Sequence, residues 1–188
     1  EVNNLLANLR KTNEAIVNDT VPAIVSIGSL QKILCNLLRE GIPIRDTETI
    51  LETLADYGAT VKDIDMLTEY VRQSLRRTIT HRFAEAGQLK VISLDANIEN
   101  QIMGAVKKVE SGSYLALDPQ TIQNIITATT REIDKIKDLV QVPIILTSPI
   151  VRVYFKKLVD QFYLNTVVLS FSEIDSDAKI QALGNITI

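Results

Sequence analysis

The sequence is poor in the residues that build metal centres and nucleophilic sites. Its 188 residues include one cysteine, one histidine and no tryptophan. A lone cysteine, Cys35, excludes an internal disulfide and fits a reducing compartment. A lone histidine, His81, excludes a two-histidine metal site, and a Cys35–His81 nucleophile pair is not expected because Cys35 falls on or beside a buried helix stripe. We therefore expect no metal and no cofactor; Cys35 is interpreted as a core filler or a redox switch, and His81 as a solvated residue or a pH-sensitive contact.

The sequence also lacks the motifs of phosphate-binding loops and nucleophile elbows. Two pairs of carboxylates, Asp134 with Asp138 and Asp175 with Asp177, have the spacing for acid–base work. The first pair falls on a helix face that also carries lysines and the second falls in a turn, so we expect both to be solvated surface groups. The prediction is that the chain is not an enzyme.

No segment approaches the ~20 apolar residues of a membrane span, and neither a signal peptide nor an initiating methionine is present. We expect an excised piece of a longer protein. With 46% hydrophobic residues the chain has enough apolar side chains for a packed core.

Charge is nearly balanced, with 20 basic and 23 acidic residues and a pI near 5.3, so no chain-wide field favours nucleic acid. One concentrated basic strip is present, and three readings of it are open: a solvated face paired with Glu48, Glu52 or Glu69, a contact for a protein, or a contact for nucleic-acid phosphates. A winged-helix nucleic-acid-binding module is the alternative, and the acidic net charge of the chain argues against it. The strip consists of Arg72, Arg76, Arg77 and Arg82, with His81 among them.

Hydrophobic periodicity predicts that residues 1–86 form a helical bundle. Its centre is a helix–loop–helix over 29–57, in which Gly41 ends the first helix, Pro43 blocks its continuation and Asp46 caps the second. Asp63 is predicted to cap one long helix that reaches Phe83. The apolar stripe of the first central helix is Leu30, Ile33, Leu34, Leu37 and Leu38.

After a junction at Gly87 the pattern changes to alternating strands and helices. We expect strands at 90–94, 143–147 and 167–171 and a last strand at 179–188. Helices are expected from Asp95 to about Glu110, from Asp118 to Leu139 and from Ser148 to Phe162, the last forming a parallel βαβ unit. The fold class is therefore α+β: a helical subdomain, 1–86, and a small α/β subdomain, 87–188, with a mostly parallel sheet.

Four stretches closely resemble the export-gate family of type III secretion (FHIPEP), which has flagellar and virulence members. They are LQKILCNLLREGIPIRDTETILETLADY (30–57), DIDMLTEYVRQSLRRTIT (63–80), ILTSPIVR (145–152) and VVLSFSEI (167–174). The resemblance implies the last two of four cytoplasmic subdomains of a bacterial inner-membrane protein. It also implies a homo-nonameric ring that docks export substrates with their chaperones and meets components of the export ATPase complex. The docking groove of the family is implied to lie upstream of this chain, and a flagellar role is favoured over the alternative, a virulence injectisome.

The loop of the helix–loop–helix is the candidate subunit interface. It carries Arg39, Glu40, Arg45 and Asp46 together with two isoleucines and the rigid Pro43. Charged groups beside apolar ones suit an oligomer contact, and a stiff loop loses little entropy on ordering. The alternative is a solvated turn.

Overall fold

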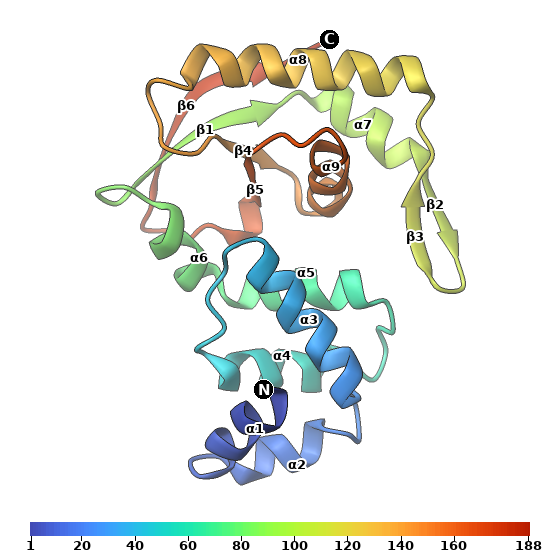
Figure 1. The fold of residues 1–188 in the computed structure, drawn as a ribbon, viewed down its shortest axis with the longest axis vertical. Helices are drawn as coiled ribbons and strands as arrows, with labels where there is room; N and C mark the ends of the chain where they lie inside the picture. The colour runs from blue at the N-terminus through green and yellow to red at the C-terminus, as the bar shows by residue number, and fades with distance from the viewer. The chain divides into compact units, whose positions relative to one another are not determined.

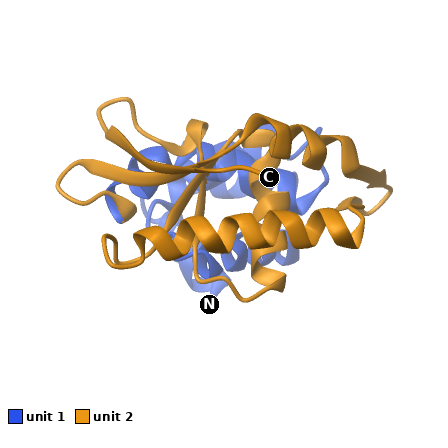
Figure 2. Ribbon diagram, turned by 90° about the horizontal axis from the view of Figure 1, so that it is seen from above, with its two compact units in different colours: residues 1–82 blue, residues 83–188 orange.

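The computed structural model describes all 188 residues and divides into two compact units, Glu1–Arg82 and Phe83–Ile188 (Figure 2). The division falls four residues before the junction expected at Gly87. The reason is local: Glu85 and Gln88 exchange backbone hydrogen bonds of 2.9 and 3.0 Å around Ala86 and Gly87, both of which have positive φ. This tight turn joins residues 85–88 to the first strand of the second unit.

The first unit consists of helices, as the periodicity predicts (Figure 1). Asp46 and Asp63 cap helices as predicted: Asp46 accepts from Thr49 N, and Asp63 accepts from the N–H groups of Asp65 and Met66. The helices are α1 Val2–Arg10, α2 Glu14–Thr20, α3 Ile27–Arg39, α4 Thr47–Tyr57, α5 Ile64–Ser74 and α6 Arg76–Phe83.

The single long helix predicted after Asp63 is wrong, because the chain breaks between α5 and α6. Leu75, at the break, has φ −88° and ψ 20°, and its N–H bonds to the carbonyls of both Val71 and Arg72. The side chain of Leu75 is nevertheless buried, so the apolar stripe continues across the break. Periodicity alone therefore does not distinguish one long helix from two helices that share a buried stripe.

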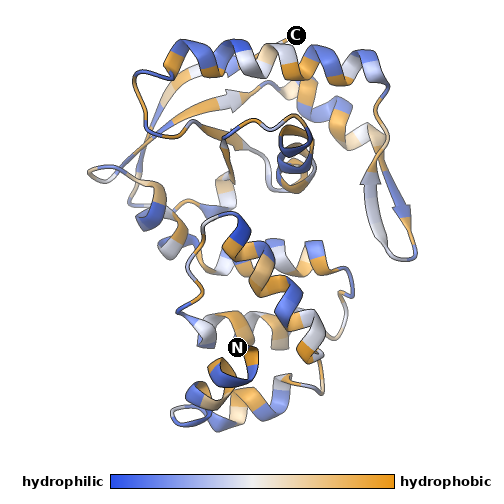
Figure 3. Ribbon diagram, in the orientation of Figure 1, coloured by the Kyte–Doolittle hydropathy of each residue, from blue (hydrophilic) through white to orange (hydrophobic).

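The core of the helical unit is formed by facing apolar stripes of α3, α4 and α5 (Figure 3). Leu38 departs from the prediction: it is 53% exposed, whereas the rest of the predicted stripe of α3 is buried. The buried residues are Leu30, Ile33, Leu34 and Leu37 from α3, Ile50, Leu51 and Leu54 from α4, and Leu67 and Val71 from α5.

The second unit is built on a four-stranded parallel sheet in the order β5-β4-β1-β6. Ile92 of β1 pairs with Ile145 of β4, which pairs with Val168 of β5, so these three side chains share one face. The β4–α9–β5 segment is the predicted parallel βαβ unit. The strands are β1 Gln88–Leu94, β4 Ile144–Thr147, β5 Val167–Ser170 and β6 Lys179–Ile186.

Three helices share a core with that face of the sheet: α7 Ala96–Ala105, α8 Pro119–Ile136 and α9 Pro149–Gln161. The helix predicted to reach Glu110 is wrong beyond Ala105. There the chain forms a two-stranded hairpin of β2 Val106–Val109 and β3 Gly112–Leu115, and a short 3-10 turn, Phe171–Glu173, follows β5. No helix of either unit is both long enough and apolar enough to cross a membrane.

Candidate functional site

The charged loop between α3 and α4 is held at both ends. Gly41, with φ 72°, turns the chain out of α3, and Ile42 N donates to Leu37 O at 3.0 Å. At the other end, Asp46 Oδ1 accepts from Thr49 N at 3.2 Å. Arg39 and Arg45 are exposed between these fixed points. The loop therefore presents two cations on a rigid frame.

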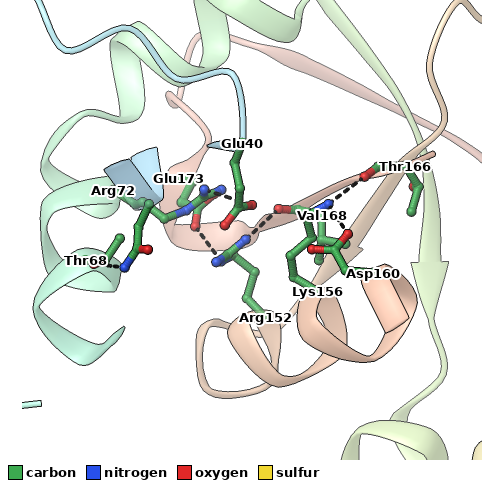
Figure 4. A network of polar contacts seen from close by, with 10 residues as sticks. Glu40, Thr68, Arg72, Arg152, Lys156, Asp160, Thr166, Val168 and Glu173 are labelled. Carbon is green, nitrogen blue, oxygen red and sulfur yellow. Dashed lines mark hydrogen bonds and ion pairs between the residues drawn. The ribbon is translucent and has the colours of Figure 1, made fainter. Parts of the chain in front are cut away.

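Glu40 and Arg72 were expected on the surface, but they pair with each other and are largely buried. Arg72 Nη1 lies 3.1 Å from Glu40 Oε2, and the side chains are 1% and 18% exposed (Figure 4). Arg72 is thus a buried structural residue and not part of an exposed strip, and its carboxylate partner is Glu40. Beside this pair, Asn36 Nδ2 donates to Thr68 Oγ1 at 3.2 Å, so α3 and α5 are joined by two polar contacts.

The apolar part of the loop also differs from the expectation. Ile42 is 1% exposed and Ile44 is half-buried, so neither is an exposed isoleucine. Leu38, directly before the loop, is the exposed apolar residue instead. The candidate interface is therefore Leu38 with Arg39 and Arg45, flanked by Asp46.

The rest of the basic strip lies on α6. Arg76, Arg77, His81 and Arg82 are all exposed. Arg77 and Arg82 already take part in polar interactions. Arg76 has none, which leaves its guanidinium available for a partner.

Sequence reasoning missed an aromatic pair beside Arg76. The rings of Tyr57 on α4 and Tyr70 on α5 stack with centroids 4.1 Å apart and an angle of 4° between their planes. They line a hollow of about 290 Å³ together with Gln73, Ser74 and Arg76. No sequence signal marks the pair, because the two tyrosines lie on different helices.

A buried ion pair in the α/β unit was missed as well. Arg152 Nε lies 3.4 Å from Glu173 Oε1, Arg152 Nη1 donates to Val168 O at 3.1 Å, and both side chains are 1% exposed or less (Figure 4). Nearby, Lys156 Nζ donates to Asp160 Oδ1 at 2.8 Å and to Thr166 O at 3.2 Å. Because the charges of Arg152 and Glu173 are buried and compensate each other, we assign this pair a structural role.

The carboxylates considered for acid–base work lie at or near the surface. Asp134, Asp138 and Asp177 are exposed, and Asp175 is half-buried in the turn before β6. No group of three or more histidine, cysteine, aspartate or glutamate side chains is placed to hold a metal ion. The chemistry on the surface is that of charged and aromatic contacts.

Comparison with known proteins identifies a family to which this chain is similar. Residues 1–179 match the FHIPEP family. The chain is similar to the flagellar biosynthesis protein FlhA of Bacillus subtilis, with 35% identity over 189 residues that cover all of this chain and 28% of that protein. It is also similar to two solved structures. The nonameric EscV cytosolic domain from the type III secretion system has 30% identity and a TM-score of 0.83, and the chain covers 55% of it.

The second structure is the complex of Chlamydia pneumoniae CdsV and CdsO, with 32% identity and a TM-score of 0.86. These matches cover 99% or more of this chain, which in turn covers 55% of each matched structure. The match over 179 residues and the shared fold agree with the resemblance found in the sequence. The chain belongs to the FHIPEP family of type III export-gate proteins.

Proposed function

We propose that this chain is part of the cytosolic portion of a bacterial protein-export gate, which forms a homo-oligomeric ring and docks export substrates with their chaperones. The observation that carries the proposal is the family match over residues 1–179. A nonameric cytosolic domain among the similar structures supports the ring. In the whole protein, a part outside this chain would anchor the ring in the inner membrane.

The ring contact is proposed to involve the loop of the helical unit. Leu38 supplies exposed apolar surface, and Arg39 and Arg45 supply charges that can pair across a subunit boundary. Glu40 supports the loop through Arg72, and Asp46 supports it by capping α4. Weak contacts suffice because anchoring to a membrane raises the effective concentration of neighbouring subunits.

The exposed arginines of α6, Arg76, Arg77 and Arg82, are proposed as a protein-contact strip. Their charge suits an acidic protein surface, which can belong to a chaperone–substrate complex, to a component of the export ATPase complex or to a neighbouring subunit. The solved complex of CdsV with CdsO supports a further protein partner for the gate as a whole.

The experiment uses the full-length gene in a strain that lacks its export gate. Reversing two loop charges, Arg39→Glu with Arg45→Glu, should abolish export of substrates into the medium. The matched control, Arg10→Glu with Lys32→Glu, changes the net charge equally at exposed positions outside the loop and should export normally. Melting of the 188-residue chain must be nearly unchanged for both variants, since exposed charges each contribute under ~1 kcal/mol to folding. Normal export by the loop variant, or export lost through unfolding, contradicts the loop assignment.

A flagellar system is favoured over an injectisome because FlhA is 35% identical over the whole chain. The full-length gene should restore motility to a flagellar gate mutant and should not restore secretion to an injectisome gate mutant. The reverse result would assign the protein to virulence secretion.

The proposal includes no catalysis, since the chain lacks phosphate-loop motifs and metal-binding clusters. Calorimetry with ATP and GTP should show no saturable binding; a dissociation constant below ~100 μM, about −5.5 kcal/mol, would contradict this. Retention of DNA should be weak, salt-sensitive and independent of sequence. Sequence-selective retention at physiological salt would support the winged-helix alternative.

A further inference from the structure

The hollow beside α6 has the chemistry of a carboxylate receptor. Its wall combines the unpaired guanidinium of Arg76, the amide of Gln73 and the tyrosines of the stacked pair. Tyr57 is 40% exposed although its ring is stacked on that of Tyr70. All these groups can donate hydrogen bonds, and a guanidinium forms charge-assisted hydrogen bonds with a carboxylate that are stronger than those between neutral groups.

A matching acidic surface occurs on α4 of the same unit. Glu48, Glu52 and Asp56 recur every four residues, so they lie within about 80° of one another on the helix. All three are exposed, and neither Glu52 nor Asp56 has an ion-pair or hydrogen-bond partner. Glu48 accepts only from the neutral amide of Asn13, at 2.7 Å. The acidic face therefore carries about three uncompensated charges.

The acidic face and the hollow point in different directions. Tyr57, which lines the hollow, lies about 180° around α4 from Glu48. One chain therefore cannot fill its own hollow with its own acidic face. Two complementary patches on different sides of one subunit are what a head-to-tail contact requires, and such contacts form a ring when the rotation between subunits closes.

We propose that the hollow formed by Tyr57, Tyr70, Gln73 and Arg76 receives the acidic face of α4 from a second copy of this chain. The inference rests on the proposed ring and names the two surfaces of one of its contacts. Charge complementarity identifies a second copy as the partner. The guanidinium of Arg76 can pair with the carboxylates of Glu52 and Asp56 on the neighbouring chain. The stacked tyrosines keep the receiving wall rigid, so little side-chain entropy is lost on contact.

The test exchanges the charges of two residues in one chain and measures self-association by analytical ultracentrifugation. Protein concentrations extend to about 1 mM, which matches the effective concentration of tethered subunits. Arg76→Glu and Glu52→Arg should each weaken association about tenfold or more, because like charges then face each other. The double variant R76E/E52R should return to nearly the wild-type association, because the pair is restored with reversed polarity. Lys32→Glu, a matched reversal on the exposed face of α3, should leave association unchanged.

The possible failures separate this inference from the proposed ring. If the wild-type chain associates but R76E has no effect, or the double variant is no better than the single ones, the hollow is not the contact and the ring proposal stands. If the wild-type chain does not associate even when tethered to vesicles through an N-terminal tag, both proposals are wrong. Melting curves of all variants must overlay, since every substituted residue is exposed.

Discussion

Arg72 on α5 reaches Glu40 at the end of α3, with 3.1 Å between Nη1 and Oε2. The pair lies at the beginning of the charged loop, where it fixes the direction in which the chain leaves α3. A residue that looks like part of a basic surface strip therefore stabilises the loop from beneath. This relationship gives a rigid base to the loop that we propose as a subunit contact.

The Arg72–Glu40 pair should contribute strongly to folding. Arg72→Met should lower the free energy of unfolding by about 2–4 kcal/mol, because a carboxylate that is only 18% exposed loses its partner. Arg39→Met, beside the same glutamate but exposed, should cost under ~1 kcal/mol. Urea unfolding of the 188-residue chain measures both, and equal losses would mean that the pair is not structural.

Gly58 is predicted to tolerate no side chain. A Cβ there would lie 2.6 Å from the carbonyl oxygen of Leu54 and 2.8 Å from methyl carbons of Ile24 and Val25. Gly58→Ala should therefore cost at least about 2 kcal/mol through overpacking. The control is Gly104→Ala in α7, where a Cβ meets nothing within 4 Å; it should be neutral or stabilise by up to about 1 kcal/mol. Thermal melting compares the two, and a stable G58A would contradict the close approach.

Tyr163 occupies a position that usually holds glycine. It follows the C-cap of α9 with φ 56°, and the bonds Leu164 N to Val159 O and Tyr163 N to Asp160 O form a Schellman motif. Its side chain is 94% exposed and gains no burial in exchange for the strained backbone. Tyr163→Gly should stabilise the chain by about 0.5–1 kcal/mol. Tyr163→Ala keeps the backbone strain and should show no such gain, so equal melting temperatures of the two variants would refute the explanation.

Acid should weaken the cap of α8. The side-chain hydrogen bond from Thr121, followed by the backbone N–H of Thr121, lowers the pKa of Asp118 below that of an ordinary aspartate. A depressed folded-state pKa adds stability above the unfolded value of ~3.9, and this stability is lost as the pH falls through the folded value. The melting difference between wild type and Asp118→Ala should therefore be constant near neutral pH and shrink in acid. Thr121→Val should move the carboxyl pKa of Asp118, measured by NMR, back towards the ordinary range; an unchanged pKa would contradict the assigned cause.

The local elements could be predicted from the sequence because their signals act over a few residues. Asp46, Asp63, Asp95 and Asp118 each cap the helix that the sequence assigned to them, since a cap needs only a short acceptor two or three residues before a free N–H. Alternation and turn residues likewise located the parallel strands. Local signals gave a wrong prediction at Leu75, where the helix breaks although the stripe of buried side chains continues.

The sequence by itself determined the family, the helix caps and the parallel strands, because these follow from long shared motifs and from signals that act over a few residues. The tertiary structure decided which charges are surface groups and which are structural. Arg72 and Arg152 are indistinguishable from exposed arginines in the sequence, and both are buried only because a glutamate from another element compensates their charge. The hollow lined by Tyr57, Tyr70 and Arg76 likewise depends on how the helices pack against one another. Side chains that are far apart along the chain meet only when helices pack, and packing depends on the whole apolar core and not on any local pattern.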